Sequence, residues 1–331
     1  MDFWGIDSML ISIIIPCYNE EDNLAELHAG LSAVMETLGE YEIIFVDDGS
    51  TDDTLNKLLG FCRTQKQCRV LEFSRNFGHQ QAISAGLDNA KGDAVIMMDA
   101  DLQHPPELIP TLIEKWKEGY EIVYTIRKDP PGTSLFKKMT ARMFYKLINT
   151  LANINIPENS ADFRLLDKKV VEQLRLMKEK TKFYRGLISW VGFNKCAVYY
   201  EASPRHAGKS KYTIWKMIKF AYDGITSFSA FPLHIATALG ALVSLFSFLY
   251  AVYAIYARLF TNQTLPGWTS VLVAVLFLGG VQLFSLGLIG GYLGKAYDEL
   301  KQRPSYIIRD VIDQSGALNP IDKKRGKGES Q

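Results

Sequence analysis

The sequence predicts an α/β protein with a doubly wound, mainly parallel sheet of the Rossmann-like kind, joined to helices at a membrane. Short apolar runs alternate with segments of helical periodicity in the first part of the chain, which is typical of parallel strands connected by helices. Polar and acidic residues directly follow three of these runs. Two segments near the carboxyl end, Leu233 to Ala257 and Thr269 to Leu293, carry no charge and are long enough to span a bilayer.

Composition limits the classes of function. Of the 331 residues, 47% are hydrophobic and 22% are charged, which is ordinary for a globular protein with some membrane added. The net charge of +1 argues against a nucleic-acid-binding protein, because such proteins usually carry a basic excess. The four cysteines lack metal-ligand spacing and indicate reduced thiols in a reducing compartment. Met1 to Met9 does not resemble a secretory signal.

Strands and helices are expected to alternate from the start of the chain. The predicted strands are Leu10 to Pro16, Glu42 to Val46, Arg69 to Phe73, Ala94 to Met98 and Ile122 to Ile126. Asn19 or Asp22 can cap the first helix, which should extend to about Leu38. Ser50 or Thr51, together with Asp53, resembles the start of the second helix. A third helix is expected to extend through Ala90.

Polar chemistry follows three of these strands, in the segments Pro16 to Glu20, Asp47 to Ser50 and Asp99 to Gln103. The carboxyl ends of parallel strands lie at one edge of the sheet, where α/β proteins bind their ligands. Asp99 and Asp101 stand two residues apart, so in an extended chain both can converge on one hard cation. Solvated turns without a ligand remain the alternative. The chain lacks Gly-x-Gly-x-x-Gly and Gly-Lys-[Ser/Thr] motifs, which argues against a dinucleotide oxidoreductase or a P-loop ATPase.

Several of these motifs, taken together and in order, resemble a known family. They are Ile14-Ile15-Pro16-Cys17-Tyr18-Asn19-Glu20, Val46-Asp47-Asp48-Gly49-Ser50, Asn76-Phe77-Gly78-His79 and Asp99-Ala100-Asp101-Leu102-Gln103-His104-Pro105. They resemble the inverting GT-A glycosyltransferases of family 2, and more narrowly the polyprenyl-phosphate glycosyltransferases, relatives of bactoprenol glucosyltransferases and dolichol-phosphate mannose synthase. The resemblance covers roughly residues 10 to 310. It implies a GT-A fold and inverting transfer of one sugar, with UDP-glucose and undecaprenyl phosphate as the favoured pair.

The resemblance also implies roles for individual residues. The donor nucleotide would be held by residues after the first, second and fourth strands: Pro16, Tyr18, Glu20, Asp47, Asp48 and Asp99. Mg2+ or Mn2+ would bind the donor diphosphate through Asp99, Asp101 and Gln103. A mannosyl or aminoarabinosyl transferase remains an alternative, and so does a processive polysaccharide synthase. The synthase normally has more spans and a Gln-x-x-Arg-Trp motif, and this chain has neither.

Asp162 and Arg164 lie in the segment Asn159 to Asp167. By resemblance, Asp162 is the candidate base or nucleophile-positioning group and Arg164 a phosphate ligand, although members close to mannose synthase carry Ser-Gly-Phe-Arg here. The alternative is that Asp162 caps a helix from Leu165 to Met177. Further along the chain, Tyr184 to Val191 and Ala197 to Glu201 are expected to form a strand pair.

Basic and aromatic segments suggest how the protein meets the membrane. Leu135 to Leu151 is either a core-facing helix with a solvated basic face or a helix at the membrane surface. Arg205, Lys209 and Lys211 lie in a basic loop, either a solvated one or one that binds diphosphate or lipid phosphate. Ile214 to Phe231 is aromatic, carries lysines and suits the membrane interface.

The order of these segments predicts four parts: a catalytic domain at 1–205, a basic loop with interfacial helices at 206–232, a transmembrane hairpin at 233–294 and a basic tail at 295–331 that is disordered after about Asp310. Basic residues flank both spans, so the catalytic domain and both termini should be cytoplasmic in a multi-pass protein of the cell membrane. Glycines give the second span a face for close helix packing, within the chain or between copies. A fragment that lacks everything from Leu233 onward is expected to retain nucleotide binding.

Overall fold

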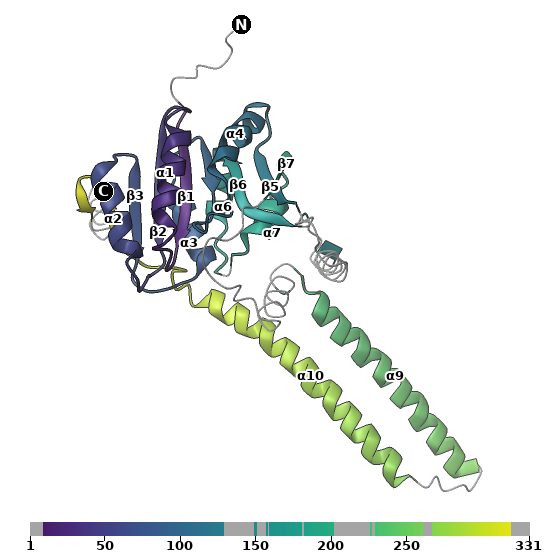
Figure 1. Ribbon diagram of the computed structural model, residues 1–331. Helices are drawn as coiled ribbons and strands as arrows, with labels where there is room; N and C mark the ends of the chain where they lie inside the picture. The colour runs from purple at the N-terminus through teal and green to yellow at the C-terminus, as the bar shows by residue number, and fades with distance from the viewer. Residues whose placement is uncertain are drawn as a thin grey trace, which may run out of the picture. The chain divides into compact units, whose positions relative to one another are not determined.

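The computed structural model describes residues 9–128, 149–150, 157, 159–180, 182–201, 226, 229–260 and 267–318. The chain divides into two compact units. One comprises Met1–Asn149, Ile154–Thr213 and Pro304–Gln331, and the other comprises Thr150–Asn153 and Ile214–Arg303. The first unit contains the sheet with its helices, and the second contains two long helices (Figure 1).

The first unit contains, among the described residues, a nine-stranded sheet in the order β7-β5-β6-β4-β1-β2-β3-β8-β9. The strands are β1 (Ile11–Cys17), β2 (Tyr41–Asp47), β3 (Cys68–Phe73), β4 (Ala94–Met97), β5 (Ile122–Arg127), β6 (Ser160–Asp167), β7 (Lys195–Tyr200), β8 (Ile308–Asp313) and β9 (Gly316–Leu318). The central four, β4-β1-β2-β3, are parallel, whereas β6 and β8 pair antiparallel to them on either side. The predicted doubly wound α/β class is confirmed.

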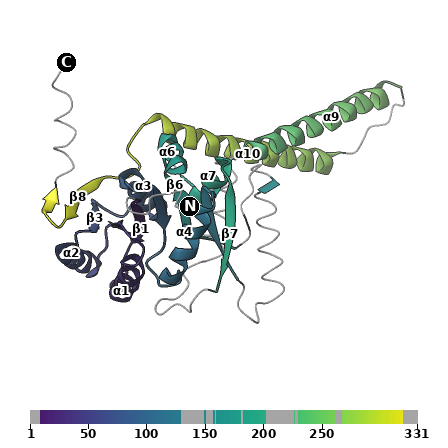
Figure 2. The ribbon, with the colours of Figure 1, turned by 90° about the horizontal axis from the view of Figure 1, so that it is seen from above.

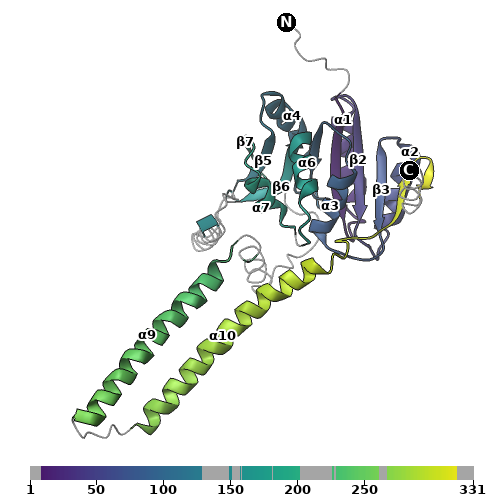
Figure 3. The same ribbon diagram turned by 180° about the vertical axis from the view of Figure 1, so that it is seen from behind.

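Helices cover both faces of this sheet. On one face lie α1 (Leu24–Met35), α2 (Thr54–Thr64) and α4 (Ile109–Lys117), the last preceded by a short 3-10 turn at Pro106–Leu108; on the other lie α3 (His79–Asn89), α6 (Lys168–Leu176) and α7 (Tyr184–Trp190) (Figures 2 and 3). This double cover explains why β1 is buried at every position, since a strand with helices on both sides has no solvent face. Gly86 of α3 packs so closely on Ile14 that a Cβ there would collide with the isoleucine side chain.

The local predictions after β5 were partly wrong. Residues 160–167 form strand β6, not the start of a helix, and α6 begins after Asp167, whose carboxylate accepts a hydrogen bond from the backbone N–H of Lys169 (2.8 Å). Tyr184 to Trp190 is helix α7, not a strand. Its buried residues Tyr184, Leu187 and Ile188 have the i, i+3, i+4 spacing of a helix.

The predicted caps of the first two helices were also wrong. Helix α1 begins after Asn23 and α2 after Asp53, and neither residue caps its helix with a side-chain hydrogen bond. The Asp53 carboxylate instead accepts from the Asn56 side-chain amide (2.8 Å). The polar residues before these helices are therefore available to bind one another across the loops.

The chain beyond Asp310 is ordered as far as Leu318, contrary to the expectation of disorder. Strand β8 pairs antiparallel with β3, and β9 pairs with β8. Without β8, β3 would be an edge strand with unpaired backbone groups. Residues 319–331, which hold the basic cluster of the tail, lie outside the described residues.

The second unit contains helices α9 (Phe231–Phe260) and α10 (Trp268–Leu300). Both are long and apolar enough to cross a membrane, judged by length and composition, over Phe231–Tyr256 and Ser270–Leu300. The Tyr292 hydroxyl donates to the Ser229 carbonyl oxygen (2.7 Å), which ties α10 to the residues just before α9.

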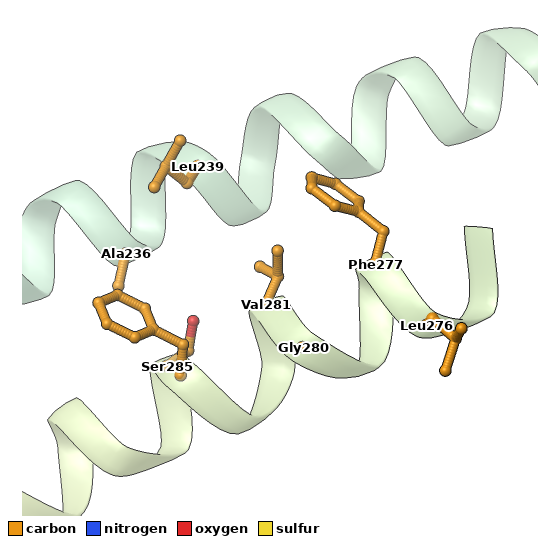
Figure 4. A pocket seen from close by; sticks show the side chains of 8 residues that line it. Ala236, Leu239, Leu276, Phe277, Gly280, Val281 and Ser285 are labelled. Atoms are coloured by element: carbon orange, nitrogen blue, oxygen red, sulfur yellow. The ribbon is translucent and has the colours of Figure 1, made fainter. Parts of the chain in front are cut away.

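An apolar groove of about 380 Å³ lies between α9 and α10 (Figure 4). Its lining residues are Ala236, Leu239, Leu276, Phe277, Gly280, Val281, Phe284 and Ser285. Phe277 and Val281 of α10 point toward α9 in this view. Gly280 has no side chain that could fill this groove.

Candidate functional site

The loops after β1 and β2 are linked to each other at the carboxyl edge of the sheet. The backbone N–H of Asn19 donates to Ser50 Oγ (3.1 Å), and Asn19 Oδ1 accepts from the N–H of Thr51 (2.8 Å). Asn19 has φ of 54°, a left-handed conformation that asparagine tolerates well. The two loops, which were predicted to lie at one edge of the sheet, are therefore joined directly by hydrogen bonds.

The three residues expected to bind the donor after β1 differ in exposure. Pro16 is buried within β1, opposite Val46 of β2. The Tyr18 side chain is 46% exposed, unlike most aromatic residues of this unit. The Glu20 carboxylate accepts a hydrogen bond from the Asn23 side chain (2.6 Å). Tyr18 is thus the residue of the three that presents a large apolar surface to a ligand.

Asp48 fixes the position of the loop after β3. Its carboxylate accepts from the backbone N–H groups of Phe77 (2.6 Å) and Gly78 (2.9 Å). Burial raises the pKa of Asp48, and these two N–H groups offset part of that rise. Gly49 has φ of 68°, and a Cβ there would lie 2.6 Å from backbone atoms of Arg75 and Asn76. The Asp-Asp-Gly-Ser and Asn-Phe-Gly-His motifs are therefore packed backbone to backbone.

Asp47 is almost fully buried, with 1% of its surface exposed. Its Oδ2 accepts from the N–H of Ser50 (3.3 Å), while Oδ1 has no hydrogen-bond partner among the residues that the structure describes. Burial raises the pKa of Asp47, and the hydrogen bonds from Ser50 counteract this only in part. A buried carboxylate oxygen without a donor costs stability. Asp47 Oδ1 is therefore a candidate acceptor for a hydrogen bond from a ligand.

Asp99 lies between two histidines. His79 Nε2 is 2.8 Å from Asp99 Oδ1, and His104 Nε2 is 3.8 Å from Oδ2. His104 Nδ1 accepts the backbone N–H of Asp99 (3.0 Å), so the hydrogen of a neutral His104 is on Nε2 and faces the carboxylate. His104 is buried and stacks on Phe163 at 5.2 Å. Burial opposes ionisation of Asp99, but the hydrogen bond from His79 and the charges of both histidines lower its pKa.

The chain turns sharply at the end of the Asp-x-Asp motif and directly after it. Leu102 has φ of 61°, and Asp101 Oδ1 accepts from the N–H of Gln103 (3.2 Å). Gln103 Oε1 accepts from Arg127 Nη1 at 3.4 Å. Strand β4 ends at Met97, so both aspartates lie just beyond the strand, with a bend between them that their spacing did not reveal.

Metal binding at this turn can be judged from its donor atoms. The described residues contain no group of three or more His, Cys, Asp or Glu side chains positioned to hold a metal ion. The atoms of Asp99, Asp101 and Gln103 are carboxylate and amide oxygens, which suit Mg2+ or Mn2+. Such a set fits a hard cation whose other ligands are diphosphate oxygens and water.

Asp162 lies on β6 and is held by an arginine that sequence analysis did not single out. Arg185 Nε donates to Asp162 Oδ1 (2.7 Å), and Arg185 Nη2 donates to Oδ2 (2.8 Å). Burial opposes ionisation of Asp162, but the charge and hydrogen bonds of Arg185 and the charge of Arg164 hold its pKa well below the usual range. The alternative that Asp162 caps a helix is wrong, because Asp162 is in mid-strand and Asp167 is the cap.

Arg164 is buried, with 3% of its surface exposed. Its Nε donates to the Ala161 carbonyl oxygen (2.9 Å), and its Nη2 donates to Ser160 Oγ (2.7 Å). Asp162 and Arg164 share one face of β6 because they stand two residues apart in a strand. The strand thus places a negative and a positive group side by side at the edge that carries Asp99.

Two comparisons with known sequences identify the family. Residues 12–175 match the model of Glycosyl transferase family 2. An uncharacterised glycosyltransferase of Synechocystis sp. is 49% identical over 302 residues, which are 91% of this chain and 95% of the relative. The chain belongs to glycosyltransferase family 2.

Another relative has a more specific name. The SfII prophage-derived bactoprenol glucosyl transferase of Shigella flexneri is 43% identical over 302 residues, covering 91% of this chain and 98% of that protein. Among solved structures, glucosyl-3-phosphoglycerate synthase from Mycobacterium tuberculosis in complex with Mn2+, UDP-glucose and phosphoglyceric acid is 19% identical, with a TM-score of 0.45 over 68% of this chain and 83% of that chain. The predicted family is confirmed by the sequence relatives alone.

The glycosyltransferase site contains residues that sequence analysis assigned no role. His79 and His104 were visible in the motifs, yet nothing in the sequence showed that both contact Asp99. Arg185 is the second residue of α7. Its place in the site was missed because this segment was predicted to be a strand. Arg205, Lys209 and Lys211 of the basic loop lie outside the described residues, as does most of Leu135 to Leu151.

Proposed function

We propose that this glycosyltransferase moves one glucosyl group from UDP-glucose to a polyprenyl phosphate, with inversion, at the cytoplasmic face of the cell membrane. The observation that carries the proposal is the extent of the match to the bactoprenol glucosyl transferase, 302 residues out of 331. An alignment of that length must include most of α9 and α10 as well as the sheet. The match to a relative that acts on bactoprenol by name therefore spans both the segments that carry the acidic site and the apolar helices.

The donor is proposed to bind along the linked loops after β1, β2 and β4. Tyr18 provides an exposed ring for the base. Asp47 Oδ1, which has no hydrogen-bond partner among the described residues, provides a buried acceptor for an N–H or hydroxyl of the nucleoside. Pro16, Glu20 and Asp48 shape this surface. Asp99, Asp101 and Gln103 would hold Mg2+ or Mn2+, which when bound neutralises charge on the departing diphosphate.

A lipid acceptor explains why such an enzyme has apolar helices. Each methylene of a polyprenyl chain exposed to water costs about 0.8 kcal/mol, so the enzyme has to bind its acceptor at the bilayer. Helices α9 and α10 meet the length and composition needed to cross it. Lys295 lies in the last two turns of α10 and Lys301 follows it, and basic flanks favour the cytoplasmic side. We infer that the catalytic domain (1–205), the basic loop with Arg205, Lys209 and Lys211 (206–232) and the tail (295–331) all lie on that side of the hairpin (233–294).

Association between copies through α10 is part of the proposal. A Cβ added at Gly279, Gly287, Gly290 or Gly294 would meet no atom of the described residues within 4 Å. A glycine-rich helix face left open in this way is suited to close packing against another helix. Light scattering of the protein in detergent would test this, with a single copy per particle as the contrary result.

The test of function uses the purified full-length protein in lipid vesicles. Labelled UDP-glucose and a panel of other nucleotide sugars are supplied with undecaprenyl phosphate, and the lipid product is separated and hydrolysed. The expected product is a single β-linked glucose on the lipid phosphate if the donor is α-linked. Long polymers would indicate a processive synthase, and preference for a mannosyl or aminoarabinosyl donor would replace glucose. Transfer to a water-soluble sugar in place of the lipid would overturn the proposal.

A further inference from the structure

The pair formed by Asp162 and Arg185 differs from an ordinary surface ion pair. Both carboxylate oxygens are engaged by two nitrogens of one guanidinium, at 2.7 and 2.8 Å. The exposed fractions of the two side chains are 12% for Asp162 and 28% for Arg185. Two-point pairing of a planar guanidinium with a carboxylate fixes orientation as well as distance. The pair joins strand β6 to helix α7.

Helix α7 is itself fastened to the helix that carries His79. The backbone N–H of Tyr184 donates to Gln80 Oε1 (3.0 Å), and Lys182 Nζ lies 3.3 Å from Ser84 Oγ. Gln80 and Ser84 belong to α3, which begins at His79. Arg185, the second residue of α7, is thus held at a place set by α3, and it pairs with Asp162 of β6. The guanidinium therefore lies at the edge of the sheet that carries Asp99.

This arrangement is poorly suited to proton abstraction by Asp162. An effective general base has a pKa near the working pH, whereas Arg185 and Arg164 hold the pKa of Asp162 well below its usual range. Both of its oxygens already accept charge-assisted hydrogen bonds. The proposed nucleophile has little need of a base, because the second pKa of a phosphate monoester is about 6.

The site has a different need, which is positive charge. Asp99, Asp101 and Asp162 carry negative charge at an edge that has to admit a nucleotide diphosphate and a phosphate monoester. A fixed guanidinium offsets Asp162 and attracts the second anion. Arginine suits this task because its donors match phosphate oxygens in a plane.

We propose that Asp162 acts through Arg185, holding the guanidinium where it binds the acceptor phosphate next to the donor sugar, and does not accept a proton. This inference rests on the proposed function. In the reaction, a phosphate oxygen forms a bond to the anomeric carbon while the bond from that carbon to the diphosphate oxygen breaks. The electron pair of the broken bond leaves with the nucleoside diphosphate, and no proton is transferred. Arg185 is then a substrate-binding residue and Asp162 a positioning residue.

Four variants test the inference in the vesicle assay with undecaprenyl phosphate: Asp162→Asn, Arg185→Lys, Arg185→Gln and the double variant Asp162→Asn with Arg185→Gln. Loss of a charged hydrogen bond predicts a rise in KM for the lipid of roughly 10-fold to 100-fold for Arg185→Gln. Asp162→Asn should give a smaller rise, and Arg185→Lys should recover part of the loss. The affinity for UDP, measured by calorimetry, should stay within about threefold of the wild type.

Two further readouts separate positioning from base catalysis. The double variant should be no worse than Arg185→Gln alone, because both changes remove one interaction. The pH dependence of kcat/KM for the lipid should follow the acceptor's second ionisation in the wild type and in Asp162→Asn alike. A base would behave otherwise: Asp162→Asn would lower kcat by roughly 100-fold to 10,000-fold at unchanged KM and would abolish the acidic limb of the kcat profile. That result overturns the inference.

A matched control separates these effects from loss of folding. Arg69 pairs with Glu42 (3.1 Å) at the opposite edge of the sheet, with exposed fractions of 17% and 15%, so Arg69→Gln breaks an ion pair of similar burial. It should lower the melting temperature but leave the KM for lipid unchanged. A rise in KM for Arg69→Gln equal to that for Arg185→Gln would overturn the inference. If Arg185→Gln does not fold, Asp162→Asn and Arg185→Lys provide the same KM and pH comparison. Failure of the proposed function looks different, because the wild type itself would then transfer no sugar to undecaprenyl phosphate.

Discussion

The two edges of the central sheet contain similar residues but use them differently. At the amino edge, Glu42 Oε1 accepts hydrogen bonds from Ser12 Oγ (2.5 Å) and from the N–H of Lys91 (2.7 Å), and Oε2 accepts from Arg69 (3.1 Å). One carboxylate is surrounded there by donors from three parts of the chain. At the carboxyl edge, an oxygen of Asp47 has no partner among the described residues, and Asp99 and Asp162 lie within the field of one another.

This difference indicates that the amino edge contributes mainly to stability and the carboxyl edge mainly to ligand binding. At the amino edge, the protein surrounds a structural carboxylate with hydrogen-bond donors, because a buried charge without partners is costly. The carboxyl edge also has protein donors, such as Arg185 for Asp162 and His79 for Asp99, but it collects several carboxylates and leaves Asp47 Oδ1 without a partner among the described residues. Substitutions at the carboxyl edge should therefore affect transfer more than stability, and substitutions at the amino edge should do the reverse.

The largest expected effect is that of Asp99→Asn. Loss of a metal-binding charge removes several kcal/mol of transition-state stabilisation, so the transfer rate should fall roughly 100-fold or more. The melting temperature should fall modestly, because the folded protein lowers the pKa of Asp99 and so gains stability from its charged form. Excess EDTA should have a similar effect on the wild type. Full activity of the wild type in EDTA would contradict a metal at this site.

The next largest effect concerns the strand that follows the second apolar helix. Because β8 pairs with β3, a fragment that ends at Pro232 should unfold more readily and bind UDP poorly, which is the opposite of the expectation from sequence. A second fragment, in which a glycine-serine linker joins residues 1–232 to residues 304–331, restores β8 and should bind UDP. Calorimetry on both fragments measures this. Equal affinity of the two fragments would show that β8 does not support the donor site.

The central fold was predictable because its signals are local. The runs that became β1 to β5 are apolar and end in polar residues, and a strand buried on both faces has that pattern wherever it occurs. Strand β6 was missed because its residues Phe163 to Leu166 are buried on both faces and also resemble the start of a helix. Strand β8 was missed because what stabilises it is the far edge of β3, which no local pattern contains.

The site was predictable in its acids and not in their partners. Asp47, Asp48, Asp99 and Asp101 follow strands, so topology alone brings them to one edge. The partners come from elsewhere: Arg185 from α7, and His79 from the start of α3. Hydrogen bonds between residues far apart in the sequence depend on how helices pack on the sheet. Residue spacing along the chain does not predict that packing.

An intermediate effect is expected from two glycines, one at each edge. A Cβ at Gly49 would lie 2.6 Å from backbone atoms of Arg75 and Asn76, and one at Gly92 would lie 2.6 Å from the backbone nitrogen of Ser12. Both Gly49→Ala and Gly92→Ala should destabilise the protein by about 1–3 kcal/mol. Only Gly49→Ala should also weaken UDP binding, because it displaces the loop held by Asp48. Weakened UDP binding in both variants, after correction for the folded fraction, would argue against this difference between the edges.

A smaller effect with a definite pH dependence is expected from Asp47→Asn. Burial raises the pKa of Asp47, so its charged form opposes folding. Stability attributable to this group is present below the unfolded-state pKa of about 3.9 and is lost as pH rises through the higher folded-state pKa. Asp47→Asn should therefore lose less stability than the wild type between acidic and neutral pH, while its affinity for UDP falls. Denaturation at several pH values measures this. Glu42→Gln should instead destabilise the protein, because it weakens the hydrogen bonds from Arg69 and Lys91.

The smallest expected effect distinguishes packing from hydrogen bonding in the segment that joins α10 to β8. Tyr306 stacks on Phe73 with ring centroids 5.3 Å apart, and its hydroxyl donates to Asp88 (2.7 Å). Phe73 in turn meets Phe77 edge to face at 5.6 Å, and the N–H of Phe77 donates to Asp48. Tyr306→Phe removes only the hydroxyl and should cost about 1 kcal/mol of stability with unchanged UDP affinity. Tyr306→Ala also removes the ring behind Phe73, so it should weaken UDP binding as well. If the two variants bind UDP equally, the stacked rings do not hold the donor loop in position.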